Sequence, residues 1–310
     1  MRIMFMGTPE IAAVCLDRLI KDGHNVVAAV TGEDKPRGRG NVMTPTAVKA
    51  LATERGIKVY TPKTLRDEAF SEVLRECAPE LIAVVAYGKI LLKSVLDYPK
   101  YGCLNAHVSL LPKYRGAAPM QRAIINGERE TGVTVMYMDE GLDTGDVAAV
   151  EKFPIADEDD FEAIHDRSAE LGGALLSKTI RDIEAGVAER VPQNNAEATY
   201  AAKIEKEDCK LDFTKSAKTL DFNIRGVTPI PGAFAYLGGK CVKIVKAKPT
   251  SGRGTPGEVI SLDGVGDGAI VAACGEGALK ITKIKPEGKG VMSAGDFIRG
   301  RKIALGDRFE

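Results

Sequence analysis

Residues 2–30 read RIMFMGTPEIAAVCLDRLIKDGHNVVAAV, and this stretch decides the fold of the first two thirds of the chain. An apolar run ends at Gly7, and Pro9 then begins a helical spacing of apolar residues that ends at Gly23. A second apolar run, Asn25–Val30, follows directly. The order of strand, helix and strand predicts two parallel strands covered by a helix.

The same alternation continues along the chain. Helical patterns cover residues 45–56 and 66–77, and a purely apolar run follows at 81–86. A strand with no polar position is typical of a parallel sheet that is buried on both faces. A long amphipathic helix is predicted at 159–184. Together these elements predict an α/β domain with a Rossmann-like, mostly parallel sheet.

The pattern changes after Gly186. Residues 191–203 are polar and poorly periodic, which predicts a linker or a strap over the first domain. Beyond Phe234, short β-rich runs alternate with glycine-rich turns, and this spacing predicts a smaller C-terminal β-barrel of the OB-like type. The runs lie at 241–245, 258–262, 269–273 and 279–284. We therefore expect a first domain at 1–188, a linker at 189–207 and a barrel at 208–310.

One glycine-rich motif is expected to have no role in binding a cofactor. Residues 252–257 read GRGTPG and fit GxGxxG, the pattern of dinucleotide-binding loops. Such a loop must begin a helix whose N-terminus receives the pyrophosphate, whereas here a β-rich run follows. We interpret the motif as a turn.

Composition and charge restrict the class of protein. The sequence has no apolar stretch long enough for a membrane span, and its six cysteines have neither CxxC pairs nor a metal-ligand spacing. We expect a cytoplasmic protein without a metal or a membrane partner. Residues 206–310 hold 18 basic and 12 acidic residues, which leaves 25 and 31 for residues 1–205. A basic C-terminal part suggests a polyanion such as RNA, although lysines that only keep a small domain in solution remain an alternative.

Asn105 and His107 are the first candidate catalytic residues. They belong to a short β-rich run that ends at Pro112. Residues two apart in a strand point to the same side, and open α/β sheets bind ligands beyond the ends of their strands. An amide beside an imidazole can stabilise an oxyanion. On this segment alone, a pair that merely satisfies loop carbonyls is an equal alternative.

A second candidate segment is acidic. The sequence MDEGLDTGDV, residues 138–147, follows a β-rich run, so Asp139 and Asp143 are expected near the end of a strand. A carboxylate beside His107 would orient the imidazole and favour its charged form. The alternative is a solvated turn of acidic residues.

These two segments resemble the folate-dependent formyltransferases. The sequence NAHVSLLPKYRGAAP, residues 105–119, has the family pattern N-x-H-x-S-L-L-P-x-x-R-G, and the second segment has the pattern D-x-G-x-D-T-G. The resemblance implies that Asn105, His107 and Asp143 are catalytic. It also implies a 10-formyltetrahydrofolate co-substrate held by Ala86, Tyr87, Gly88, Ser109, Leu110, Leu111, Pro112 and Asp139.

Two further segments resemble the branch of this family whose acceptor is the α-amino group of initiator methionyl-tRNA. The insertion DKPRGRG, residues 34–40, offers Arg37 and Arg39 for contacts with the acceptor stem. The segment after Thr199 resembles the start of that branch's second domain and offers Lys203 and Lys206. No obligate protein partner is expected.

Three alternatives remain, and one departure from the family is visible. The acceptor could instead be a nucleotide-linked amino sugar, the reaction could be hydrolysis of the formylfolate, or the chain could be a non-catalytic RNA-binding protein. The family often has tryptophan where this chain has Phe213 and Ile230. Both positions are predicted to be packing sites.

Overall fold

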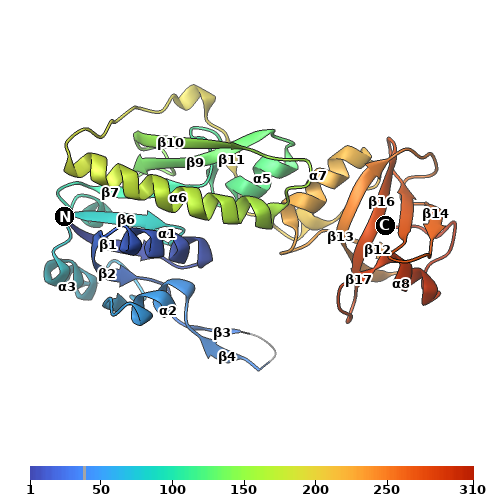
Figure 1. Ribbon diagram of the computed structural model, residues 1–310, viewed down its shortest axis with the longest axis horizontal. Coiled ribbons are helices and arrows are strands. Elements are labelled where there is room, and N and C mark those ends of the chain that lie inside the picture. Colours follow the sequence, from blue (N-terminus) through green and yellow to red (C-terminus); the bar gives the residue numbers. More distant parts are fainter. Residues whose placement is uncertain (38–39) are drawn as a thin grey trace. The chain divides into compact units, whose positions relative to one another are not determined.

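A seven-stranded sheet forms the centre of the N-terminal part of the computed structural model, which describes residues 1–37 and 40–310 (Figure 1). Its strands are β1 (Arg2–Gly7), β2 (Asn25–Val30), β5 (Val59–Tyr60), β6 (Leu81–Val85), β7 (Cys103–His107), β9 (Glu130–Tyr137) and β10 (Val147–Pro154). The spatial order is β10-β9-β7-β6-β1-β2-β5. The last five strands of that order are parallel, whereas β9 and β10 are antiparallel additions. The sheet confirms the predicted fold class.

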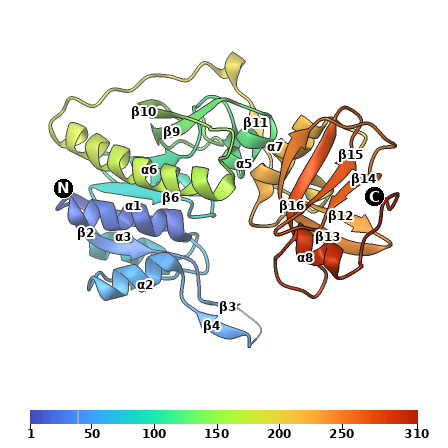
Figure 2. The same cartoon turned by 45° about the vertical axis from the view of Figure 1, so that its right-hand side comes forward.

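Helices cover both faces of this sheet. They are α1 (Glu10–Lys21), α2 (Ala47–Glu54) and α6 (Phe161–Glu184) on one face, and α3 (Glu68–Cys77) and α4 (Lys93–Leu96) on the other. Side chains of β1 point alternately to the two faces of the sheet. Phe5 therefore packs with α1 and α6 on one face, whereas Met6 packs with α3 on the other. α1 and α6 lie side by side along the sheet (Figures 1 and 2).

The C-terminal part is an antiparallel sheet that closes on itself. Its elements are α7 (Ala217–Val227), β12 (Phe234–Leu237), β13 (Lys240–Thr250), β14 (Val259–Asp263), β15 (Ala269–Ala273), β16 (Ala278–Pro286), β17 (Met292–Ser293) and α8 (Ala294–Arg299). The strand order β12-β13-β16-β15-β14 leaves two edges. The last residues join them, because Phe309 forms a bridge with Leu237 beside one edge and Arg308 with Glu258 beside the other. This closure confirms the predicted barrel.

The chain divides into two compact units that do not follow a single cut in the sequence. The first contains Met1–Pro119, Glu130–Pro154 and His165–Ala201, and the second contains Met120–Arg129, Ile155–Ile164 and Ala202–Glu310. The second unit therefore includes α5 (Pro119–Ile125) apart from its first residue. The polar segment 191–203 begins as a strap on the first unit, where Val191 pairs with Val147 and β11 (Tyr200–Ala201) pairs with β8 (Arg115–Gly116). The linker and domain boundaries drawn from the sequence stay predictions.

Several details differ from expectation. A hairpin of β3 (Lys35–Arg37) and β4 (Val42–Thr44), strand β10 and helix α7 were not predicted. Ile230 is 74% exposed, so the packing role predicted for it is wrong, whereas Phe213 is 4% exposed and confirmed as a packing residue. The GRGTPG motif leads into β14 and begins no helix, as predicted. Across the described ranges, the structure has no helix with the length and apolar character needed to cross a bilayer.

The closure of the barrel depends on Phe309. Its ring is 2% exposed and stacks on Phe213 with 5.6 Å between the ring centroids. Replacing Phe309 by Ala should lower the free energy of unfolding by about 3–5 kcal/mol, the usual loss for a buried aromatic side chain. Urea denaturation would measure this loss, with Val265→Ala as the control, because Val265 is 84% exposed in the same unit. A loss for Phe309→Ala no greater than that of the control would contradict the closure.

Candidate active site

Strand β7 places Asn105 and His107 on one face of the first sheet. Its alternate residues Leu104 and Ala106 pack with α1 and α6, so Asn105 and His107 point to the side on which Cys103 packs with α4. Both residues lie toward the carboxyl end of the strand. The strand order reverses beside β1, between β6 and β2, and open α/β sheets bind ligands at such a reversal.

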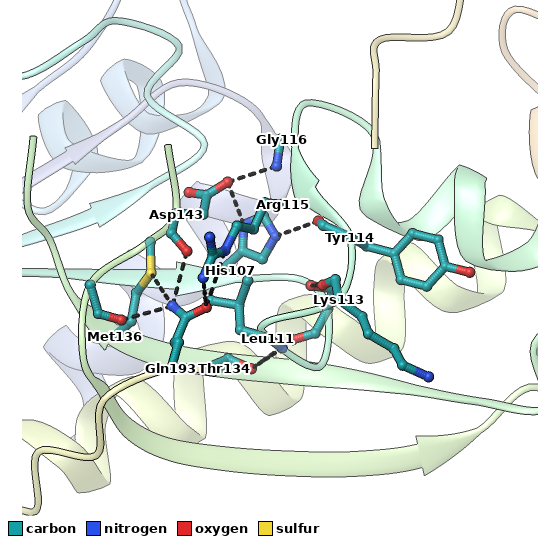
Figure 3. Close-up of polar contacts among 12 residues, drawn as sticks. His107, Leu111, Lys113, Tyr114, Arg115, Gly116, Thr134, Met136, Asp143 and Gln193 are labelled. Atoms are coloured by element: carbon teal, nitrogen blue, oxygen red, sulfur yellow. Dashed lines mark hydrogen bonds and ion pairs between the residues drawn. The ribbon is translucent and has the colours of Figure 1, made fainter. Parts of the chain in front are cut away.

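His107 is 7% exposed and has a defined ring orientation (Figure 3). Its Nε2 lies 3.0 Å from the carbonyl oxygen of Tyr114. Because a carbonyl only accepts hydrogen bonds, Nε2 must carry a proton. The other nitrogen, Nδ1, lies 3.7 Å from Oδ2 of Asp143. That distance suits an ion pair with a charged ring and is too long for a hydrogen bond, so Nδ1 remains available to a substrate.

Asp143 reaches His107 from a loop that folds back over the strand ends. Its backbone is left-handed, with φ of 54°, and its Oδ2 accepts a 2.7 Å hydrogen bond from the N–H of Gly116. A side chain at Gly116 would place Cβ 2.9 Å from the carbonyl oxygen of Ala201. Glycine is therefore required where the strap, β8 and Asp143 meet.

Asn105 is half-buried, and its amide is uncommitted. Within residues 1–37 and 40–310, no protein group forms a hydrogen bond with this side chain. An amide that is partly accessible and unpaired can donate to an oxygen that approaches the end of β7. The structure thus brings the three predicted catalytic residues to one place, and their roles stay predictions.

The loop after β6 has room for polar contacts with a ligand. Ala86 and Gly88 are exposed and have positive φ angles of 44° and 80°. In the described part of the chain, the N–H groups of Tyr87 and Gly88 have no hydrogen-bond acceptor. The hydroxyl of Tyr87 is buried without a partner there, and burial raises the pKa of Tyr87 to about 12. These two backbone donors lie near the end of β6, the strand that pairs with β7, and are available to a polar ligand.

The other positions predicted to bind folate are partly occupied by contacts within their own loops. Ser109 donates a 2.7 Å hydrogen bond to the carbonyl of Lys113, and the N–H of Leu111 donates to Oγ1 of Thr134. Leu110 and Pro112 are half-buried between them. Asp139 accepts hydrogen bonds from the Gly141 N–H and the Thr144 hydroxyl. These side chains shape the loops, and their contact with folate stays a prediction.

Three of the four residues predicted to bind tRNA lie in the described part of the chain. Arg37 ends β3, and Arg39 lies outside the described residues. Lys203 and Lys206 are exposed residues of the second unit, and Lys203 lies 3.7 Å from Glu205. Within 1–37 and 40–310, no three His, Cys, Asp or Glu side chains are placed to hold a metal ion.

Two residues beside the site were not singled out from the sequence. Arg115 is 2% exposed and donates hydrogen bonds from Nε and Nη2 to Oε1 of Gln193, at 3.2 and 2.7 Å. Gln193 in turn donates to the carbonyl oxygens of Asp143 and Gly145, at 2.9 and 2.7 Å. The R-G pair of the motif pointed to Arg115, but Gln193 stands in a polar, aperiodic segment that carries no such signal.

The chain is similar to known proteins over nearly its whole length. Residues 1–180 match the family model described as "Formyl transferase", and residues 203–302 match "Formyl transferase, C-terminal domain". Both parts of the chain thus fall in the class of formyl transferases. The chain is also 46% identical over 306 residues to the methionyl-tRNA formyltransferase of Geotalea uraniireducens (strain Rf4), covering 99% of this chain and 97% of that one. The chain therefore belongs to the formyl transferase family, among the methionyl-tRNA formyltransferases.

Solved structures share the fold. HypX from Aquifex aeolicus in complex with tetrahydrofolic acid has a TM-score of 0.65 and 22% identity, and the match covers 100% of this chain and 50% of that one. This chain thus spans about half the length of HypX. An N-formyltransferase from Helicobacter canadensis, in complex with folinic acid and dTDP-3-aminofucose, has a TM-score of 0.66 and 21% identity over 90% of this chain and 97% of that one.

The unpartnered hydroxyl of Tyr87 can be tested without any substrate. A buried polar group without a hydrogen bond costs about 1–3 kcal/mol. Tyr87→Phe should therefore leave the free energy of unfolding unchanged or raise it by about 1 kcal/mol, as measured by urea denaturation. Thr134→Val is the contrast, because that hydroxyl contacts both Ser109 and Leu111 and its loss should destabilise. Destabilisation by Tyr87→Phe as large as that of Thr134→Val would show that the phenol has a partner.

Proposed function

We propose that the chain transfers the formyl group of 10-formyltetrahydrofolate to the α-amino group of methionyl-tRNA, with Asn105, His107 and Asp143 as catalytic residues. The proposal rests mainly on one observation. The amide of Asn105, Nδ1 of His107 and the carboxylate of Asp143 lie at the carboxyl end of β7. The folate supplies an activated formyl group and is consumed.

Catalysis of this reaction depends more on stabilising the charges that develop on the reacting atoms than on forming a covalent intermediate with the enzyme. The neutral amine attacks the formyl carbon, its nitrogen becomes positive, and the formyl oxygen becomes negative. Asn105 and the Nδ1–H of a charged His107 would donate hydrogen bonds to that oxygen, where preorganised donors act most strongly. As the bond between the formyl carbon and N10 of the folate breaks, the proton of the amine passes to N10. Asp143 would keep His107 charged and oriented.

The second unit offers a surface for the backbone of the tRNA. Strands β13 and β16 place three pairs of lysines directly opposite one another, namely Lys243 with Lys285, Lys246 with Lys283, and Lys248 with Lys280. Five of the six are exposed, and in the described part of the chain only Lys248 forms an ion pair, with Glu158. We call these six residues the lysine face.

The length of the lysine face suits a polymeric anion better than a nucleotide sugar. From Lys243 to Lys248 the strand advances five residues, or roughly 17 Å at about 3.4 Å per residue. A diphosphate is much shorter, so it could use only part of this face. The charge of a tRNA repeats along its backbone and could use all of it.

The catalytic assignment predicts a large loss of rate. Asn105→Ala or His107→Ala should each lower kcat about 10²–10³-fold, the usual effect of losing one oxyanion donor. The assay mixes 10-formyltetrahydrofolate with labelled methionyl-tRNA and detects formylmethionine after deacylation. Asn25→Ala is a matched control, because Asn25 is exposed at the opposite end of the sheet, at the start of β2.

The outcomes separate the alternatives. If wild-type protein removes the formyl group from folate but makes no formylmethionine, the acceptor is wrong, and a sugar nucleotide or water comes next. If Asn105→Ala and His107→Ala both retain wild-type kcat, the catalytic assignment is wrong. Competition by uncharged tRNA, but not by a nucleotide sugar, is expected for a tRNA substrate.

The lysine face predicts a specific dependence on salt. Lys246→Ala with Lys283→Ala should raise the KM for methionyl-tRNA without changing kcat. The slope of log KM against log salt should become shallower by about 2, because each phosphate contact contributes about one unit. Lys178→Ala on α6 removes a lysine paired with Asp182 in the first unit and serves as the control. An unchanged slope in the double variant would rule out this face as the tRNA contact.

A further inference from the structure

We infer that Gln193 is a positioning residue for Asp143 and that the strap over the first unit is part of the active site. The inference rests on the proposed function, since it concerns the residue that would keep His107 oriented. Among the described residues, no hydrogen bond joins Gln193 to His107 or to the carboxylate of Asp143. It holds the backbone from which that carboxylate extends (Figure 3).

The orientation of the Gln193 amide is fixed by Arg115. A guanidinium only donates hydrogen bonds, so the oxygen of the amide must face it. The NH2 group must then face two carbonyl oxygens of the loop that carries Asp143. All four hydrogen-bonding positions of the amide are used: two accept from Arg115, and two donate to Asp143 and Gly145.

The main chain at Asp143 and Gly145 depends on Gln193 for its hydrogen bonds. Asp143 has a left-handed backbone with φ of 54°, a conformation that is uncommon for non-glycine residues although aspartate tolerates it better than most. In the described ranges, no group besides the Gln193 amide forms a hydrogen bond with the carbonyl oxygen of Asp143 or of Gly145. The Gly116 N–H fixes the carboxylate, and Gln193 fixes the main chain that carries it.

Replacing the amide by a carboxylate separates two roles of Gln193. Gln193→Glu keeps an acceptor for Arg115 and adds an ion pair, but it presents oxygen where two N–H groups donated. If Gln193 only satisfies a buried guanidinium, this variant should be as active as wild type. If Gln193 positions Asp143, the variant should lose activity although the Arg115 contact is kept.

The test is a double-mutant cycle in the formyl-transfer assay. Gln193→Glu and Gln193→Ala should each lower kcat at least about tenfold and up to about 10²-fold, the scale of misplacing a reacting group by about 1 Å. The KM for methionyl-tRNA should be unchanged. In an Asp143→Ala background the same substitutions should have no further effect, because Gln193 acts only through Asp143. Asn194→Ala is the matched control, since the hydrogen bonds of that neighbouring amide within the described residues go to Glu197 and to the Ala196 N–H.

Each outcome of these measurements has a different meaning. Wild-type kcat in Gln193→Glu, or a loss that multiplies fully with that of Asp143→Ala, would overturn the positioning role. Thermal unfolding of each variant excludes a loss caused by misfolding, and an equal loss in Asn194→Ala would assign the effect to a general disturbance of the strap. If the wild-type protein makes no formylmethionine, the proposed function fails first, and the failure is recognised before any variant is compared.

Discussion

The buried guanidinium of Arg115 holds the strap against the body of the first unit. Moving a charge out of water costs several kcal/mol unless hydrogen bonds compensate it. At 2% exposure, Arg115 has no ion pair within the described residues, and its compensation comes from the amide oxygens of Gln193 and Asn195. These partners lie 78 and 80 positions further along the chain. The strap must therefore stay in place for the charge to stay buried.

A series of contacts connects Arg115 and the strap to the residues that are predicted to be catalytic. The strap continues into β11, which pairs with β8 and passes so close to Gly116 that no side chain fits there. The N–H of Gly116 holds the carboxylate of Asp143, which lies beside Nδ1 of His107. A polar segment that resembles a linker in sequence thus orders a site built on the sheet. It does so through hydrogen bonds, since few of its residues are buried.

The parts of this arrangement that sequence could predict are those with local causes. The periods of β1, α1 and β2 follow from which faces are buried, and the period of two placed Asn105 and His107 together. Strand β10 escaped prediction because it lies at the edge of the sheet and buries only one of its eight residues, so it has no clear apolar pattern. Gln193 escaped because its role is a contact across many residues, which leaves no periodicity. The expectation for Ile230 came from family resemblance alone, and between Pro229 and Pro231 its side chain points to solvent.

The lysine face shows that a count of charges along the sequence predicts little about where those charges lie in the fold. The whole chain has a formal net charge of zero, and the count for residues 206–310 gave only a modest excess of basic residues. Register shows that six lysines oppose one another on two neighbouring strands, a placement that disfavours the sheet because like charges directly opposite repel. Departures from such local rules are expected at functional or strained sites. A bound polyanion would remove that repulsion, so the same pairs that weaken the free barrel would strengthen its complex with tRNA.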